Sequence, residues 1–330
     1  MSRQTRTATA VARSNIALAK YWGKAKVTEN IPVVPSLSMT LEELVTVTEV
    51  QFDASFPTDE LWLDGRRGTP REAGRVVRLL DRVRQMTGTS EHAKVVSRNE
   101  FPTAAGLASS ASGFAALAAA ASAAAGAPLA PTSLSALARR SSASAARSIF
   151  GGFVALDGGV DQSSDLSAVE VAPRESWNVR LIVALTSRGQ KEVGSTEAMT
   201  RSRDTSPLYA TWVAEAPRLF EAVVSGVKSR DLERVGSAME ESTLCFHACA
   251  MTSRPSVLYW RPGTVAGLHT VRQLRAAGTG AWATMDAGPH VKVLCEACDA
   301  ETVRARLAET EGVLDVVVAS PGRGVRIADR

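Results

Sequence analysis

The spacing of apolar and polar residues along the chain predicts a mixed α/β protein. Alternation rich in β-branched residues indicates strands over 6–14 and 36–50, and a 3.6-residue period indicates a helix over 71–86. By the same criteria the chain continues with a strand at 93–98, an Ala-rich helix ended by Gly126 and Pro128, a helix at 132–140 and a strand at 151–158.

From residue 178 onward the pattern becomes mainly helical. The apolar run 178–187 predicts one buried strand. After it we expect helices near 192–202, 207–227, 230–250, 262–277 and 300–310, and strands near 279–286, 290–295 and 313–319. A chain of 330 residues commonly forms two domains that share a cleft, so we predict domains 1–178 and 179–330.

The composition is that of an ordinary folded protein, with 45% hydrophobic and 22% charged residues. The 38 basic residues exceed the 34 acidic ones by four, too few for a nucleic-acid binder but suitable for a cleft that receives anionic small molecules. The chain contains neither an apolar run of about 18 residues, as a membrane span needs, nor an apolar leader segment. We therefore expect a cytoplasmic protein with a small-molecule substrate and with no membrane or nucleic acid as partner.

The four cysteines, Cys245, Cys249, Cys295 and Cys298, have spacings that could hold zinc. Cys245 and Cys249 lie in an apolar stretch at helical spacing, which is more typical of buried thiols. We expect free thiols and no structural metal.

The strongest local signal for chemistry lies at residues 102–113. The segment PTAAGLASSASG consists mainly of small residues and runs directly into the Ala-rich helix. Such a loop lets backbone N–H groups surround a phosphate at a helix N-terminus. It matches neither a Walker A loop nor a dinucleotide-binding fingerprint. On composition alone, a loop of small residues that simply packs tightly explains it equally well.

Three further segments carry charged residues in unusual settings. Lys20 and Lys24 lie together in a chain with only seven lysines, which suggests contacts with anionic oxygens. Arg147 follows small residues that leave room for its guanidinium to grip a carboxylate. Asp286 ends an apolar strand. Taken singly, the lysines fit a solvated pair and Asp286 fits a turn residue.

Taken together and in this order, the segments resemble one family. The chain reads SNIALAKYWGK, SLSMTL, PTAAGLASSASG, SASAARSIFGGFV, GSTEAMTRSRDTSPL, FHACAM and MDAGPHVKVL, which is similar to the mevalonate diphosphate decarboxylases. These belong to the superfamily of galactokinase, homoserine kinase, mevalonate kinase and phosphomevalonate kinase (GHMP). The resemblance covers nearly the whole chain. It implies a two-domain GHMP kinase-like α/β (α+β) fold with the active-site cleft between the domains.

The activity that the resemblance implies is ATP-dependent decarboxylation of (R)-mevalonate 5-diphosphate. The products would be isopentenyl diphosphate, ADP, phosphate and CO2, formed through 3-phosphorylation in the mevalonate pathway of isoprenoid biosynthesis. ATP, Mg2+ and a homodimer are implied as well. One alternative is a related kinase or decarboxylase acting on mevalonate 5-phosphate or mevalonate, and another is a non-catalytic ligand-binding protein. Retention of Arg147 and Asp286 argues against a pure kinase, because a carboxylate clamp has no purpose if CO2 never leaves.

The matched motifs also imply roles for individual residues. Asp286 matches the Asp that deprotonates the 3-hydroxyl, Lys20 the Lys that stabilises the phosphoryl group, and Arg147 the Arg that holds the carboxylate. Substrate contacts are implied for Ala17, Tyr21, Trp22, Gly23, Lys24, Ser142, Ala143, Ser144, Arg147, Ser195, Thr196 and Met199. Nucleotide contacts are implied for Asn99, Ala104, Ala105, Gly106, Leu107, Ala108, Ser109 and Ser110.

The chain departs from the family's motifs at three positions. Ser141 and Ala143 replace two glycines, which would strain the turn if either position needs a positive φ. Val34 replaces an asparagine. These changes bear on the exact substrate more than on the reaction class.

A basic stripe follows one face of the helix at 71–86 and consists of Arg71, Arg75, Arg78 and Arg82. A solvated face explains such a stripe, since charge runs on helices commonly serve solubility. The alternative is that Arg71 or Arg75 reaches the substrate's terminal phosphate, as an Arg in this region does in the family.

Overall fold

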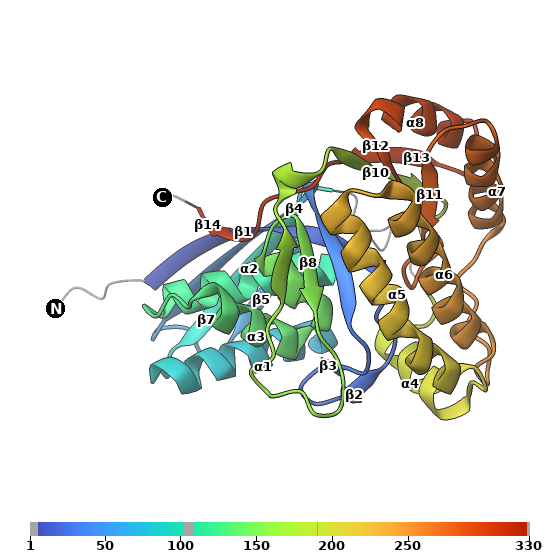
Figure 1. Ribbon diagram of the computed structural model, residues 1–330. Helices are drawn as coiled ribbons and strands as arrows, with labels where there is room; N and C mark the ends of the chain where they lie inside the picture. Colours follow the sequence, from blue (N-terminus) through green and yellow to red (C-terminus); the bar gives the residue numbers. More distant parts are fainter. Residues whose placement is uncertain (1–5, 102–108, 190, 329–330) are drawn as a thin grey trace.

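The computed structural model describes residues 6–101, 109–189 and 191–328. Figure 1 shows two groups of elements, an N-terminal group of strands with α1–α3 and a group of helices and strands from the second half of the chain. No helix in the described ranges is long and apolar enough to cross a membrane.

The first sheet is built on two long antiparallel strands, β1 (Arg6–Ala19) and β4 (Ser36–Asp53). Its strand order is β14-β1-β4-β7-β5-β6, with β8 paired to the beginning of β4 and β9 paired to β8. The other strands are β5 (Glu60–Leu63), β6 (Arg66–Arg67), β7 (His92–Asn99), β8 (Phe153–Leu156), β9 (Val169–Ala172) and β14 (Arg326–Ile327). A separate short hairpin contains β2 (Lys24–Lys26) and β3 (Ile31–Pro32).

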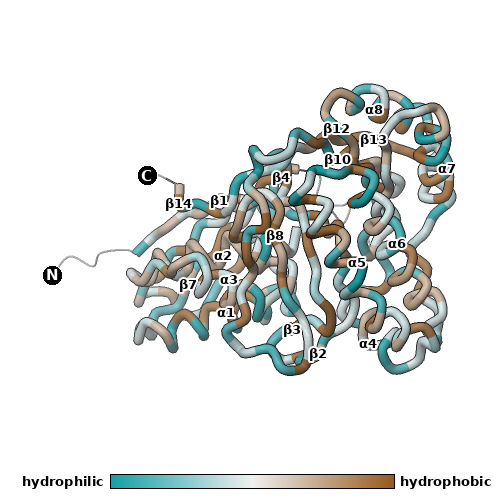
Figure 2. Tube along the Cα trace, in the orientation of Figure 1, coloured by the Kyte–Doolittle hydropathy of each residue, from teal (hydrophilic) through white to brown (hydrophobic). Residues whose placement is uncertain are grey.

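Three helices accompany this sheet: α1 (Pro70–Thr87), α2 (Ser109–Ala124) and α3 (Pro131–Ser141). α1 begins with a capping box, in which Thr69 and Glu72 satisfy each other's backbone N–H groups. α2 lies between the sheet and the other two helices, and its alanines allow close approach on all sides. Figure 2 shows both hydrophilic and hydrophobic segments along α1, as expected of a helix with one face on the core.

The second sheet has the order β11-β12-β10-β13, and all its neighbours are antiparallel. Its strands are β10 (Val179–Leu185), β11 (Ala281–Thr284), β12 (Val291–Glu296) and β13 (Asp315–Ala319). α7 (Pro262–Ala276) and α8 (Ala300–Ala308) cover one face. The other face packs with α5 (Tyr209–Ser229) and α6 (Leu232–Met251), and α4 (Ser195–Thr205) lies beside α6.

β1 and β4 connect the two halves through a shared core. Ala10 and Ala12 of β1 pack with α1–α3, whereas Ile16 and Leu18 pack with β10, α5 and α6. A register shift between Arg13 and Asn15 separates the two parts of β1. The end of β1 is therefore held where the halves meet, and Lys20 follows it immediately.

The predicted α/β architecture is confirmed, and every predicted helix and strand has a counterpart. The first strand runs to Ala19 rather than ending at residue 14, and the small-residue segment between the helix predicted at 132–140 and the next strand contains a 3-10 helix over Ala143–Ile149. The strands β2, β3, β5, β6, β9 and β14 were not predicted, because two to four residues are too few to show a period. The domain boundary at 178 stays a prediction; β14 pairs with β1 of the first sheet.

Candidate active site

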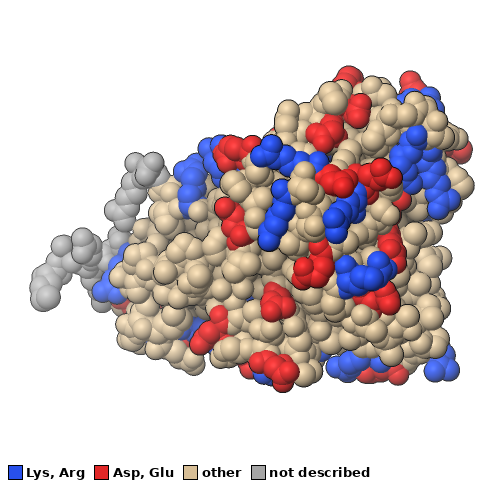
Figure 3. All heavy atoms as spheres, viewed as in Figure 1, with Lys and Arg blue, Asp and Glu red and all other residues tan. Residues whose placement is uncertain are grey.

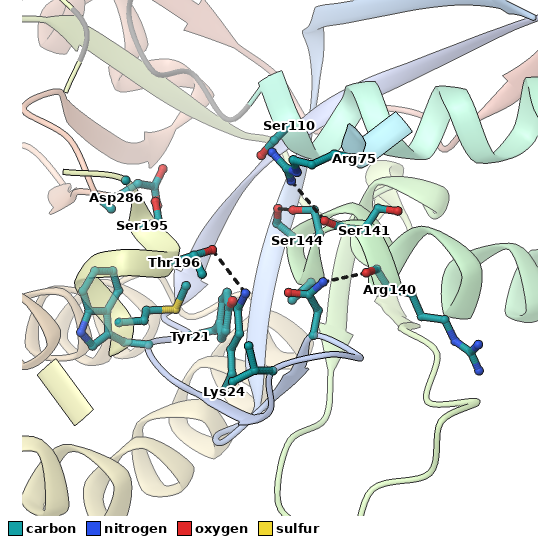
Figure 4. A pocket seen from close by; sticks show the side chains of 18 of the residues that line it. Tyr21, Lys24, Arg75, Ser110, Arg140, Ser141, Ser144, Ser195, Thr196 and Asp286 are labelled. Carbon is teal, nitrogen blue, oxygen red and sulfur yellow. Dashed lines mark hydrogen bonds between the residues drawn. The ribbon is translucent and has the colours of Figure 1, made fainter. Parts of the chain in front are cut away.

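A cavity of about 1070 Å³ lies where the two halves meet, and most of the predicted site residues line it. Figure 4 shows Asp286 and Ser195 on one side and Ser110, Arg75, Ser141 and Ser144 on another. The predicted residues that line the cavity are Ala17, Lys20, Tyr21, Trp22, Lys24, Ser109, Ser110, Ser142, Ala143, Ser144, Arg147, Ser195, Thr196, Met199 and Asp286.

The Asp286 carboxylate lies between two buried ammonium groups. Lys20 Nζ donates to Asp286 Oδ1 at 2.8 Å, and Lys292 Nζ forms an ion pair with Asp286 Oδ2 at 3.0 Å. The lysine side chains are 3% and 1% exposed, whereas that of Asp286 is 28% exposed toward the cavity it lines. Burial alone would raise the pKa of Asp286, but the charges of Lys20 and Lys292 hold it well below its usual range.

The same burial changes the titration of Lys20. Loss of solvation lowers the pKa of Lys20 to about 8, although the charge of Asp286 opposes the shift. The Lys20 ammonium therefore titrates just above neutral pH, unlike an exposed lysine.

Arg147 lies in the 3-10 helix after α3 and is almost completely buried. Its Nε atom donates to Ser38 Oγ at 2.9 Å and its Nη1 atom to Ser36 Oγ at 2.7 Å, both from β4. Within the described residues the Nη2 group makes no hydrogen bond, and Arg147 lines the cavity. The guanidinium is thus fixed in orientation and keeps one donor group for a ligand.

Several polar side chains of the cavity are held by neighbours from distant parts of the chain. Lys24 Nζ donates to Thr196 Oγ1 at 3.3 Å, which links the 20–24 segment to α4. The hydroxyl groups of Ser142 and Ser144 lie 3.1 Å apart. Asn15 donates to the Ser144 carbonyl at 2.9 Å. These contacts preset the cavity wall without a ligand.

Trp22 lines the cavity but is only 3% exposed. Its indole Nε1 donates to Ser202 Oγ at 3.0 Å, and the Trp22 carbonyl accepts from Trp212 Nε1 at 2.8 Å. The side chain therefore anchors the loop after β1 to α4 and α5.

Two predicted contact residues lie elsewhere, and five fall outside the description. Gly23 forms the turn between Trp22 and Lys24 at φ 116° and is not part of the cavity wall. Asn99 is the last residue of β7. Its side chain accepts a hydrogen bond from Thr46 Oγ1 at 2.7 Å and donates one to Asp64. Ala104, Ala105, Gly106, Leu107 and Ala108 lie outside the described residues.

Sequence reasoning did not select Lys191 or Lys292. Lys191 lines the cavity and donates to Ser195 Oγ at 2.8 Å, and burial lowers its pKa. The scarcity of lysine in this arginine-rich chain is a signal that points to both residues. Four of the seven lysines lie at this site: Lys20, Lys24, Lys191 and Lys292.

The basic stripe faces the cavity rather than open solvent alone. Among the described residues that line the cavity, nine are Lys or Arg and one, Asp286, is acidic. Arg75 is fixed by a 3.1 Å hydrogen bond from Nη2 to the Ser141 carbonyl and by stacking over Phe114. By contrast, on the face shown in Figure 3, acidic and basic side chains lie next to one another over the second half of the chain.

The departures at positions 141 and 143 cause no backbone strain. The described non-glycine residues with positive φ are Asn30, Asp64 and Arg230, so neither Ser141 nor Ala143 adopts the left-handed conformation. Ser141 is instead the last residue of α3.

The cysteines show no arrangement typical of a metal centre. Cys245, Cys249, Cys295 and Cys298 are free thiols. No group of three or more His, Cys, Asp or Glu side chains among the described residues is placed to hold an ion.

Both halves of the chain match known protein families. Residues 12–168 match the family described as "Diphosphomevalonate decarboxylase-like N-terminal domain", and residues 181–315 match "Mevalonate 5-diphosphate decarboxylase C-terminal domain". A diphosphomevalonate decarboxylase of Candida albicans is 34% identical over 316 residues, which span 91% of this chain and 87% of the relative.

Solved structures agree along nearly the whole chain. One described as "MDDEF in complex with MVAPP, AMPPCP and Magnesium" is 38% identical with a TM-score of 0.92, and the match covers 99% of this chain and 100% of that one. The mevalonate diphosphate decarboxylase of Staphylococcus aureus is 34% identical with a TM-score of 0.92, covering 99% of each chain. With this identity and coverage, the resemblance is confirmed, and the chain belongs to the diphosphomevalonate decarboxylase family.

Proposed function

We propose that this protein catalyses the ATP-dependent decarboxylation of (R)-mevalonate 5-diphosphate to isopentenyl diphosphate, ADP, phosphate and CO2. The observation that carries the proposal is one cavity in which Asp286, paired with Lys20, and Arg147 both face the space for a substrate. A tertiary hydroxyl is a poor leaving group, so it must first be phosphorylated. Phosphate loss then draws electrons from the carboxylate as the C–C bond breaks.

Asp286 is the proposed acceptor of the 3-hydroxyl proton. Because two ammonium groups hold its pKa well below the usual range, the carboxylate is ionised at neutral pH. The same charges make it a weak base. It therefore accepts the proton as the bond between the substrate oxygen and phosphorus forms, since that bond makes the hydroxyl far more acidic.

Lys20 is proposed to act on the transferring phosphoryl group, and Arg147 on the substrate carboxylate. Lys20 lines the cavity beside Asp286 and supplies positive charge to the transferring phosphoryl group. Arg147 offers its Nη2 group to the substrate carboxylate while Ser36 and Ser38 hold the rest of the guanidinium. Release of CO2 from a clamped carboxylate needs this fixed orientation.

The triphosphate of ATP is proposed to bind at the N-terminus of α2. Ser109 and Ser110 begin this helix and line the cavity, so the positive end of the helix faces the ligand space. The cavity contains one carboxylate and several hydroxyl groups, which fits Mg2+ carried by phosphate oxygens rather than by a protein cage. Mg2+ would neutralise phosphate charge there.

The substrate's diphosphate is proposed to lie against Lys24 and the basic stripe. Arg75 is the best-placed stripe residue, because its guanidinium is already held by Ser141 and Phe114. We also predict a homodimer, a cytoplasmic location and a domain boundary at residue 178, each of which needs its own measurement.

The test measures CO2 and ADP separately with MgATP and each of mevalonate, its 5-phosphate and its 5-diphosphate. We expect CO2 and ADP in equal amounts, with the diphosphate preferred. ADP without CO2 would replace this proposal by a kinase, and no turnover of any acid would favour a binding protein.

The matched variants are Asp286→Asn and Asp161→Asn. Asp286→Asn should reduce turnover by about 100-fold or more, the lower limit for loss of a general base. Asp161 is exposed and does not line the cavity, so its variant should match the wild type. Because Asp286→Asn leaves two buried lysines without a counter-charge, its fold is checked by circular dichroism, with Asp286→Glu as a charge-retaining variant.

A further inference from the structure

Lys292 is a buried charged residue in a strand whose neighbouring buried residues are apolar. It lies inside β12, opposite Val183 of β10 and Thr284 of β11, so a strand flanks it on each side. Its side chain is 1% exposed. A buried ammonium group is costly unless it is paired.

The alternation along β12 shows which face Lys292 occupies. Val291 and Val293 belong to the core beneath α7 and α8, whereas Leu294 belongs to the core shared with α5 and α6. Lys292 has the parity of Leu294 and therefore projects from the same face as that leucine. A lysine in this layer breaks the hydrophobic pattern of the strand, and such local violations are typical of functional positions.

The ion pair described for Lys292 joins it to a single carboxylate oxygen. Its ion pair is with Asp286 Oδ2 at 3.0 Å, and it is not among the residues that line the cavity. Lys20, which holds the other carboxylate oxygen, does line the cavity. One lysine thus faces the substrate and the other holds the carboxylate from behind.

We propose that Lys292 is a positioning residue for the decarboxylation reaction. It fixes the Asp286 carboxylate from inside the sheet, so that Lys20 can interact with the transferring phosphoryl group. The inference rests on the proposed function, because it assigns Asp286 the role given there. Without Lys292, transfer of Lys20 to the phosphoryl group would leave the carboxylate without its ion-pair partners and free to rotate.

Other charged groups near Asp286 also influence its pKa, and they determine how far that pKa moves when Lys292 is removed. Lys20 and Lys292 contribute most to its ionisation. Burial lowers the pKa values of Lys191 and Arg147, and attraction to the nearby Asp286 carboxylate opposes that shift in both. Burial also lowers the pKa of nearby His247 to about 3. His247 is therefore neutral near pH 7, and loss of Lys292 leaves Asp286 facing the remaining cations.

The experiment compares Lys292→Met, Lys292→Arg and the surface control Lys228→Met. Methionine fits an apolar layer, and the variant retains Lys20 as the counter-charge of Asp286, so we expect a folded protein. If Lys292→Met does not fold, Lys292→Gln carries the same test. For Lys292→Met we expect kcat at least tenfold lower, with KM for mevalonate 5-diphosphate within threefold of the wild type.

The pH dependence of kcat separates positioning from a structural role. Removal of one cation raises the pKa of Asp286 toward its ordinary value, so on the acid side the limb on which activity falls should lie at higher pH than in the wild type. Lys292→Arg should restore part of kcat and move the limb back, and Lys228→Met should match the wild type throughout.

Two outcomes overturn the inference. One is a Lys292→Met enzyme with wild-type kcat and pH profile. The other is a lower kcat at every pH with no shift of the limb and no rescue by arginine, which indicates a structural role only. Because wild-type CO2 release is measured in the same series, failure of the proposed function itself is recognised separately.

Discussion

The Nζ atom of Lys20 lies 2.8 Å from Oδ1 of Asp286, although 266 positions separate the two residues in the chain. Lys20 follows β1 of the first sheet, and Asp286 follows β11 of the second. Each element contributes one charge to a pair that exists only when both halves are folded and docked. The active-site chemistry is therefore coupled to the packing between the halves.

The low pKa of Lys20 predicts an alkaline limb in the activity profile. As the pH rises through about 8, Lys20 loses its proton and its charge, so kcat/KM should fall. Burial also lowers the pKa of Lys24 to about 8. A pH profile of Lys20→Arg and one of Lys24→Arg identify the responsible group. We expect the limb to move to higher pH in Lys20→Arg, and an unchanged limb in that variant would assign it to another group.

Replacement of Arg147 by Gln should impair decarboxylation more than phosphoryl transfer. An anion left without its buried partner costs about 3–5 kcal/mol, so CO2 release should fall by about 100-fold or more. Single-turnover reactions with labelled ATP and carboxyl-labelled substrate count ADP and CO2 separately.

The matched control for Arg147 is Ser38→Ala. It removes the hydroxyl that accepts from Arg147 Nε but leaves the charge in place, so a smaller loss is expected. Full-rate CO2 release by Arg147→Gln would exclude Arg147 as the carboxylate clamp.

Glu42 should stabilise the fold in a pH-dependent manner. Although burial opposes the shift, hydrogen bonds from Arg323 and the charge of Arg13 lower the pKa of Glu42 from 4.5 to about 2. A depressed carboxyl pKa contributes stability that is complete above about 4.5 and lost as the pH falls toward 2. We expect Glu42→Gln to lower the free energy of unfolding by about 1–3 kcal/mol at pH 7.

Urea unfolding of wild type and Glu42→Gln at pH 7, 5 and 3.5 measures this contribution. The difference between the proteins should shrink at pH 3.5. A difference that stays constant across this range would show that the charge of Glu42 contributes nothing.

Gly23→Ala should disturb the cavity through the turn between Trp22 and Lys24. A Cβ atom at Gly23 would overlap the Tyr209 hydroxyl and lie 2.8 Å from Val33 Cγ1, on a backbone with φ of 116°. Gly65→Ala is the matched control, since its φ is 81° and a Cβ atom there meets nothing within 4 Å. Both variants should lose about 1 kcal/mol or more of stability from the backbone, but Gly23→Ala should also raise KM. Equal KM values in the two variants would contradict the clash.

Much of this protein follows from local sequence patterns. Periodicity located the helices and the longer strands, because burial on one face imposes a repeat on a single segment. The sequence also determined the order of motifs that identified the family, including the residues around Lys20, Arg147 and Asp286. The small residues at 102–113 fit a phosphate loop and a tightly packed loop equally well, and the described part of that segment begins a helix at the cavity.

The tertiary structure alone decided which charges meet. Lys292 looks like an interruption of an apolar strand in the sequence. It lies 3.0 Å from Asp286 because β11 and β12 pair on either side of the loop that holds Asp286, whereas the other partner of this carboxylate, Lys20, comes from the distant end of β1. Likewise, the positions of Ser36 and Ser38 on β4 do not reveal that they hold Arg147. Side-chain pairs across sheets and domains leave no periodic trace, because their geometry depends on elements that are distant in the chain.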